Sequence, residues 1–216
     1  EYFMFKKNKN FYTDIYSFFV LKKKLSKKRI ETIFTLLRVD STFKTTFDNR
    51  MFDINKKLLK YLNKFFSRKV MICDFGISSG QSTFELFIDV GKSKIKNIYG
   101  FDKQIYFQLY KFEKFIFLFS LNKDLLMVEY DKYCLRYRYF YIFKKFEKIL
   151  FHIFSFMKIK FVISKVLVKD FDKIDKFKFF EQDIFNIEKK YYNLFDVVRV
   201  SNLLNYTYFS EVELKK

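Results

Sequence analysis

Glycine placement constrains this chain more than any other feature of its sequence. The 216 residues contain four glycines and no proline, and all four glycines fall between positions 76 and 100. Two of them stand in Asp74-Phe75-Gly76-Ile77-Ser78-Ser79-Gly80, which follows an apolar run and precedes an amphipathic one. Glycine lets a backbone turn sharply and approach a ligand closely, and a helix that begins there offers unpaired N–H groups to an anion. The segment therefore predicts a strand, a ligand-binding loop and a helix.

Apolar periodicity around this loop predicts alternating helices and strands. Helices are expected at Lys56–Phe66 and Gly80–Val90, and strands at Val70–Cys73, Ile95–Phe101, Phe177–Phe180 and Phe195–Val200. Such alternation indicates an α/β fold with parallel strands. Between the second and third of these strands, Phe115–Phe119 and Leu125–Tyr130 predict a β-hairpin, and residues 139–168 predict one or two helices.

The predicted organisation is one domain with an extension. Residues 1–40 are basic and aromatic and are expected to form a helical N-terminal extension. Residues 41–216 are expected to form the α/β domain, with the hairpin and helices as an insertion at about 104–172.

Carboxylates are expected at the ends of two parallel strands. Asp102 ends the second strand, 28 residues after Asp74 (102 − 74 = 28), and Asp183 follows the third strand. Ligands of α/β sheets bind at the carboxyl ends of the strands. A carboxylate at Asp102 can accept hydrogen bonds from both hydroxyls of a ribose. One at Asp183 can accept from an adenine amino group, with Ile184 against the ring.

These segments resemble the motifs of class I S-adenosylmethionine-dependent methyltransferases, including a poorly characterised bacterial group. The resemblance covers roughly residues 40–216 and rests on four motifs in order, Asp74–Gly80, Tyr99–Asp102, Gln182–Phe185 and Phe195–Val200. It implies a Rossmann-like, mostly parallel sheet with helices on both faces, and a loop that holds the methionine part of the cofactor. The cofactor-binding residues that it implies are Asp74, Gly76, Ile77, Ser78, Gly80, Asp102, Asp183 and Ile184. Many members place groups that face the methyl acceptor just past the fourth strand, where this chain has Asn202.

The chain departs from the family pattern in two respects. Ser78 replaces the middle glycine of the loop. The family domain has seven strands in the order 3-2-1-4-5-7-6, whereas this sequence accounts for the first four, so the sheet is expected to be incomplete, with its C-terminal strands missing. An exposed edge at the fourth strand would invite pairing with a partner chain.

Composition leaves other functions open. The net charge of +19 would suit nucleic acid or an anionic membrane surface, but lysine is spread along the whole chain, which favours a solvated surface. A non-enzymatic basic module that binds RNA or a membrane surface therefore remains an alternative, as does a methyltransferase that has lost its activity. A nicotinamide-dependent oxidoreductase is disfavoured because Ser78 stands where its fingerprint needs glycine. The methyl acceptor is unknown. The lack of proline disfavours the two main classes of DNA base methyltransferase.

The cysteine content and the hydropathy of the chain indicate where in the cell it is expected to reside. Cys73 and Cys134 form no disulfide framework and no metal site, which fits reduced thiols in a cytoplasmic protein. The longest apolar stretch, Ile149–Leu167, is interrupted by three lysines, so no transmembrane segment is predicted.

Overall fold

The computed structural model describes residues 12–21, 23, 25–39, 42–43, 49–135, 137–159, 161–165 and 174–200. Internal contacts group the chain into two compact units. Unit 1 combines residues 1–45 with 106–166, and unit 2 combines residues 46–105 with 167–216. This grouping differs from the predicted division at residue 40, because the N-terminal region joins the segment predicted as an insertion.

Unit 2 contains a four-stranded parallel sheet. Its strands are β3 (Val70–Phe75), β4 (Ile95–Asp102), β10 (Phe177–Glu181) and β11 (Val197–Val200). They lie in the order β10-β4-β3-β11, and every neighbouring pair is parallel. The predicted α/β class is therefore confirmed, and each predicted strand differs from the observed one by at most two residues at either end.

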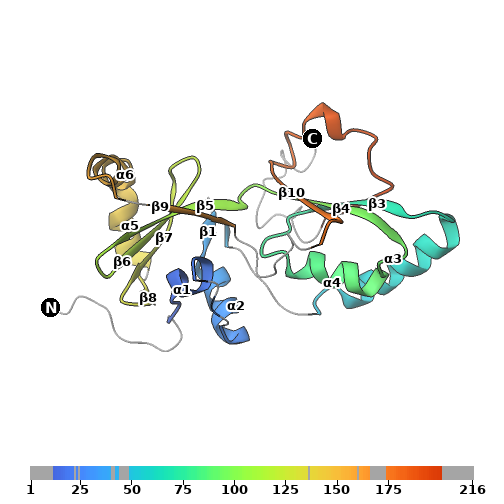
Figure 1. The fold of residues 1–216 in the computed structure, drawn as a ribbon, viewed down its shortest axis with the longest axis horizontal. Helices are drawn as coiled ribbons and strands as arrows, with labels where there is room; N and C mark the ends of the chain where they lie inside the picture. The colour runs from blue at the N-terminus through green and yellow to red at the C-terminus, as the bar shows by residue number, and fades with distance from the viewer. Residues whose placement is uncertain are drawn as a thin grey trace. The chain divides into compact units, whose positions relative to one another are not determined.

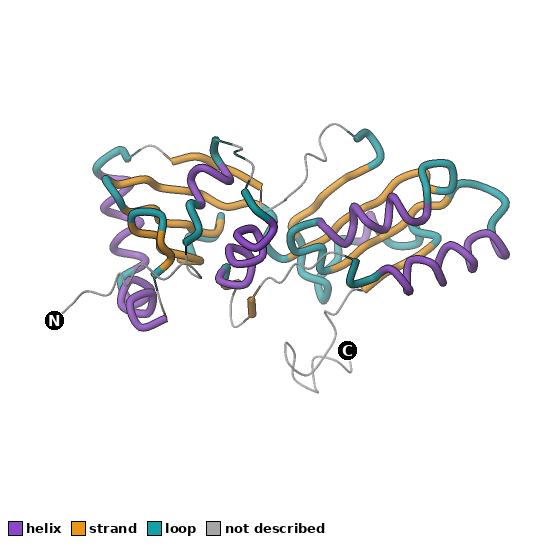
Figure 2. Tube along the Cα trace, turned by 90° about the horizontal axis from the view of Figure 1, so that it is seen from below, coloured by secondary structure: helices purple, strands orange, loops and turns teal. Residues whose placement is uncertain are grey.

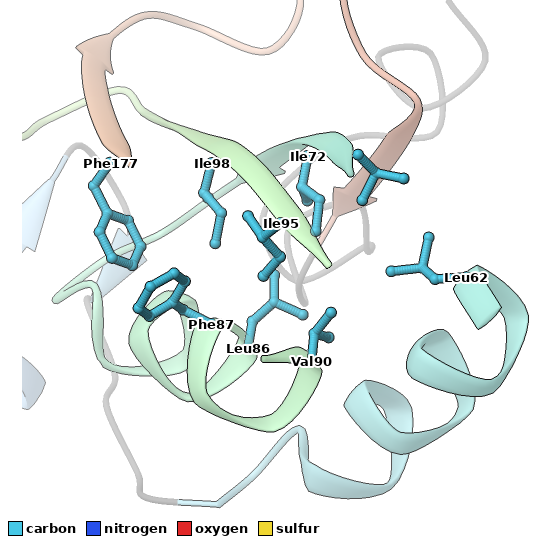
Figure 3. Close-up of a cluster of buried hydrophobic side chains, with 9 residues drawn as sticks. Leu62, Ile72, Leu86, Phe87, Val90, Ile95, Ile98 and Phe177 are labelled. Carbon is cyan, nitrogen blue, oxygen red and sulfur yellow. The ribbon is translucent and has the colours of Figure 1, made fainter. Parts of the chain in front are cut away.

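Two helices cover one face of this sheet. α3 (Phe52–Phe65) and α4 (Gln81–Val90) lie side by side on that face (Figures 1 and 2). Leu62 of α3 and Leu86 of α4 point toward Ile72 of β3 in a fully buried apolar cluster (Figure 3). Each helix is amphipathic, so its packing on the sheet removes one apolar face from water.

The described residues that cover the other face of the sheet include no long helix. Its core consists of Cys73, Phe75, Tyr99, Phe101 and Tyr191. Tyr191 ends a short 3₁₀ helix, η3 (Lys189–Tyr191), and its ring meets the Phe101 ring edge-on at 5.0 Å. The prediction of helices on both faces is therefore not met by the described residues. The connection 182–196 is short and aromatic, and it covers this face with ring contacts instead.

Unit 1 contains a five-stranded antiparallel sheet in the order β8-β7-β6-β5-β9. Its strands are β5 (Tyr106–Phe112), β6 (Phe115–Ser120), β7 (Leu125–Tyr130), β8 (Tyr133–Cys134) and β9 (Phe161–Lys165). The predicted hairpin is confirmed as β6–β7. The prediction of one or two helices over residues 139–168 was wrong toward the C-terminal end of this range, because Phe161–Lys165 is a strand that pairs with β5.

Helices cover both faces of the antiparallel sheet. They are α1 (Ile15–Phe19), α2 (Lys27–Leu36), α5 (Tyr137–Lys145) and α6 (Glu147–Phe156), and a small ribbon is formed by β1 (Arg38–Val39) and β2 (Thr42–Phe43). Phe19 of α1 contacts Phe107 with ring centroids 4.8 Å apart, whereas Phe154 of α6 stacks on Tyr110 at 5.4 Å. Phe107 and Tyr110 point to opposite faces because strand side chains alternate. No helix in the described part of the chain is long and apolar enough to cross a bilayer.

Candidate functional site

The loop between β3 and α4 turns by means of three left-handed residues. Gly76, Ser78 and Gly80 have φ angles of 72°, 52° and 75°. The Gly76 N–H donates to the Phe101 carbonyl oxygen at 2.8 Å, which ties the loop to β4. Glycine adopts this conformation freely, whereas serine adopts it at a cost. The loop therefore keeps the backbone path that its glycines predict, and Ser78 follows it at the family's middle glycine position.

The loop is followed directly by the N-terminus of a helix. Gly80 is the N-cap residue of the ten-residue α4 and has no side chain to cap it, and the Gln81 N–H donates to the Ser79 hydroxyl at 3.4 Å. The first N–H groups of a helix lack carbonyl partners within the helix and carry partial positive charge. This end of α4 is therefore suited to a carboxylate or another small anion.

Asp102 joins the end of β4 to this loop. Its Oδ2 accepts a hydrogen bond from the Ser78 backbone N–H at 2.7 Å, and its Oδ1 accepts one from the Gln104 N–H at 3.1 Å. The residue is partly exposed. A carboxylate that is fixed by backbone donors and still meets solvent is a preorganised acceptor for a ligand hydroxyl.

Asp183 lies beside Asp102, at the end of the neighbouring strand. The Gln182 N–H donates to the Asp102 carbonyl oxygen at 2.9 Å, and the Asp183 carboxylate lies 4.0 Å from Nζ of Lys103. Asp183 also accepts a hydrogen bond from the Phe185 N–H, and Ile184 packs against the aromatic face of the sheet. The structure therefore brings the loop, Asp102, Asp183 and Ile184 to one edge of the parallel sheet.

Two predicted site residues direct their side chains away from this edge. Asp74 is fully buried, and it accepts hydrogen bonds from Arg199 at 2.8 and 2.5 Å and from the Thr83 hydroxyl at 2.7 Å. Ile77 is 1% exposed and packs against Gly100. In this arrangement, both side chains support the loop from inside.

A buried polar network extends from Asp74. Arg199 donates from Nη1 to Oδ1 of Asn55 at 3.1 Å, and Asn55 donates from Nδ2 to Oδ2 of Asp89 at 2.7 Å. The network links β3, β11, α3 and α4 below the loop. Sequence reasoning missed it because Arg199 lies 125 residues from Asp74. The available signal was a lone arginine inside the apolar run Val197–Val200, which needs a buried partner.

Glu85 is a second residue that sequence reasoning missed. Its Oε1 accepts hydrogen bonds from the Asn49 N–H at 3.0 Å and from the side-chain amide of Gln81, the first residue of α4, at 2.9 Å. Its other oxygen, Oε2, is buried and has no hydrogen-bond partner among the described residues. Such an orphaned acceptor close to the loop suits a ligand that carries a hydrogen-bond donor.

The described residues offer neither a reactive thiol nor a cluster of metal ligands at this edge. Burial raises the pKa of Cys73 to about 12, and the nearby Asp74 carboxylate contributes, so this thiol stays protonated. In the described part of the chain, no three His, Cys, Asp or Glu side chains are grouped to hold a metal ion. Asn202, predicted to face the methyl acceptor, lies outside the described residues.

Comparison of the chain with protein-family models, with curated proteins and with solved structures found no match.

Proposed function

We propose that unit 2 is the S-adenosylmethionine-binding part of a methyltransferase with a Rossmann-like sheet. The observation that carries the proposal is the meeting of three strand ends at one edge. There the Asp102 carboxylate accepts a hydrogen bond from the Ser78 N–H of the loop. The Asp102 carbonyl oxygen accepts one from the N–H of Gln182, the residue before Asp183. The glycine-containing loop suits the small zwitterionic tail of such a ligand, and the two carboxylates at the strand ends suit its nucleoside.

The strand order supports a site at this edge. β10, β4, β3 and β11 lie as the third, second, first and fourth parallel strands of the chain. The order reverses direction between β3 and β11, and open α/β sheets bind ligands outside the carboxyl ends of their strands at such a switch point. The loop that follows β3 lies at this point. The order also agrees with the corresponding part of the order 3-2-1-4-5-7-6 found in the resembled family.

Each part of the cofactor has a residue that suits it. The methionine carboxylate suits the N–H groups at the start of α4, and its amino group suits the buried Oε2 of Glu85. The ribose hydroxyls suit Asp102, and the adenine suits Asp183 and Ile184. When bound, S-adenosylmethionine supplies a methyl group on a sulfonium, which is electrophilic without covalent help from the protein. The chain's contribution is to orient the cofactor and exclude water while the acceptor is held in line. Asn202 remains the proposed acceptor-facing residue.

Calorimetric titration of the full chain with S-adenosylhomocysteine tests this proposal. We expect micromolar binding by the wild type. Asp102→Ala should weaken binding about 10- to 100-fold, since a hydrogen bond to a charged group contributes about 1.5–3 kcal/mol. Asp175→Ala is the matched control. Asp175 is an exposed carboxylate just before β10, so it lies at the amino ends of the parallel strands, away from the proposed site at their carboxyl ends.

Two results would overturn the proposal. One is the absence of binding by a wild-type chain whose circular dichroism shows it folded. The other is equal affinity of the wild type and Asp102→Ala. Titration with NAD distinguishes the oxidoreductase alternative, which predicts heat with NAD and none with S-adenosylhomocysteine. Because Asp102 also fixes the loop, the circular dichroism of each variant must match that of the wild type.

A further inference from the structure

The α5–α6 segment of unit 1 carries an exposed apolar stripe. Its members are Ile142, Phe146, Ile149, Ile153 and Phe156, which follow one another at spacings of 4, 3, 4 and 3 residues. Phe156 is 84% exposed, and the other four are between 42% and 56% exposed. Met157, at 53%, extends the stripe. Ile149, Ile153 and Phe156 share one face of α6, because residues three and four apart are neighbours on a helix. Ile142 lies in α5, and Phe146 lies at the junction of the two helices.

This stripe is separate from the face that holds the helices on their sheet. Phe154 is buried in the unit 1 core, and Leu150 and Phe151 pack against the same cluster. α6 therefore has two apolar faces, and the described residues of unit 1 pack against only one of them. Large apolar side chains gathered on one exposed helix face are typical of an interaction site.

The charges around the stripe are almost all positive. Lys145, Lys148 and Lys158 are exposed. The only acidic residue in 137–159 is Glu147, whose side chain is 17% exposed. Glu147 accepts hydrogen bonds from Lys144 and from the Leu125 N–H, each at 2.6 Å, so its charge is already compensated.

We propose that the α5–α6 face docks on an anionic lipid membrane surface. Interfacial helices combine bulky apolar side chains, which enter the boundary of the acyl chains, with lysines that reach the anionic headgroups. The stripe and its three flanking lysines supply both parts. The inference is independent of the cofactor proposal, because it rests on unit 1 alone.

The chemistry of the face favours lipid over two other partners. RNA binding would use basic side chains interleaved with rings that stack on bases, whereas three of the five stripe members are isoleucine, which cannot stack. A second copy of this face would bring lysines against lysines, and like charges in contact disfavour pairing.

Flotation of the full chain with lipid vesicles tests the proposal. Vesicles of phosphatidylcholine alone are compared with vesicles of phosphatidylcholine and phosphatidylglycerol in a three-to-one ratio. We expect binding to the anionic vesicles, which decreases as salt is raised because the headgroup attraction is screened. The double variant Ile149→Ser, Phe156→Ser should bind at least about tenfold more weakly, since it removes two apolar side chains from the buried surface.

Controls make the result specific to this face. Ile54→Ser, Ile88→Ser changes two isoleucines of unit 2 that are 50% and 57% exposed, and it should bind as the wild type does. Lys145→Glu, Lys148→Glu should remove the preference for anionic vesicles. The proposal is overturned if the wild type binds neither vesicle or both equally, or if the Ile149/Phe156 variant binds as well as the wild type. It is also overturned if sedimentation shows that the wild type is a dimer and that only the Ile149/Phe156 variant dissociates it, since the face would then pair with a second copy of the chain.

Discussion

Replacing Arg199 by methionine should open unit 2 at the junction of β3 and β11. The Arg199 and Asp74 side chains are 6% and 1% exposed, and two hydrogen bonds join them. Methionine fills much of the same volume but leaves the Asp74 carboxylate buried, with the Thr83 hydroxyl as its remaining hydrogen-bond donor among the described residues. Removing one partner of a buried ion pair costs about 3–5 kcal/mol, since the other charge stays uncompensated. We expect a loss of that size in the free energy of unfolding of unit 2.

Hydrogen exchange followed by mass spectrometry measures this loss within unit 2. Peptides that cover β3 and β11 report the opening free energy of these strands separately from unit 1. Arg68→Met is the matched control, because Arg68 also pairs with an aspartate, Asp196, at 2.5 Å but is 64% exposed. Exposed ion pairs contribute little, so the control should leave exchange in β3 nearly unchanged.

A double-mutant cycle distinguishes the ion pair from a general packing defect. Asp74→Asn alone should also destabilise unit 2, since it leaves a buried guanidinium without a carboxylate. The double variant Asp74→Asn, Arg199→Met should cost about 3 kcal/mol less than the sum of the two single variants, because it leaves no uncompensated charge. Additive single effects, or a loss below about 1 kcal/mol in Arg199→Met, would refute the reasoning.

Three other perturbations have defined outcomes. Gly100→Ala places a Cβ 2.6 Å from Cδ1 of Phe179, so unit 2 should lose about 1–3 kcal/mol of stability, and Phe179→Leu should recover part of the loss in thermal melting. Burial raises the pKa of Glu129 from 4.5 to about 7, so folded unit 1 retains a proton that the unfolded chain releases. Its stability should be full below about pH 4.5, fall by about 3 kcal/mol up to about pH 7 and then level off, and urea unfolding of Glu129→Gln should lack this slope. Glu85→Gln should bind S-adenosylhomocysteine about tenfold more weakly in calorimetry, since the amide is a poorer acceptor for an amino group.

The parallel sheet could be predicted because its signals are local. Val70–Cys73 and Ile95–Phe101 are short apolar runs, and the glycines at 76 and 80 mark the turn between a strand and a helix. The positions of Asp102 and Asp183 then followed from parallel pairing, which places carboxyl ends together. The register confirms this placement, since Glu181 pairs with Asp102.

Beyond the β6–β7 hairpin, the antiparallel sheet and the orientation of Asp74 could not be predicted, because each depends on residues that are distant in the sequence. Tyr106–Phe112 mixes rings with Gln108 and Lys111, so its periodicity does not identify a strand, and β9 resembles a continuation of the preceding helix. Pairing between strands defines both, because β5 pairs antiparallel with β6 and with β9. Asp74 was predicted to contact the cofactor because its loop position matches a motif, whereas its orientation is decided by Arg199, a residue of β11.

Hydrogen exchange with and without S-adenosylhomocysteine tests the central claim most directly, because it locates the ligand as well as detecting it. A ligand at the carboxyl edge of the parallel sheet should slow exchange in peptides that cover 76–84, 102–105 and 182–186. Peptides from the β6–β7 hairpin of unit 1 should be unchanged. Protection confined to unit 1, or no protection at saturating ligand, would contradict the assignment of this edge as the cofactor site.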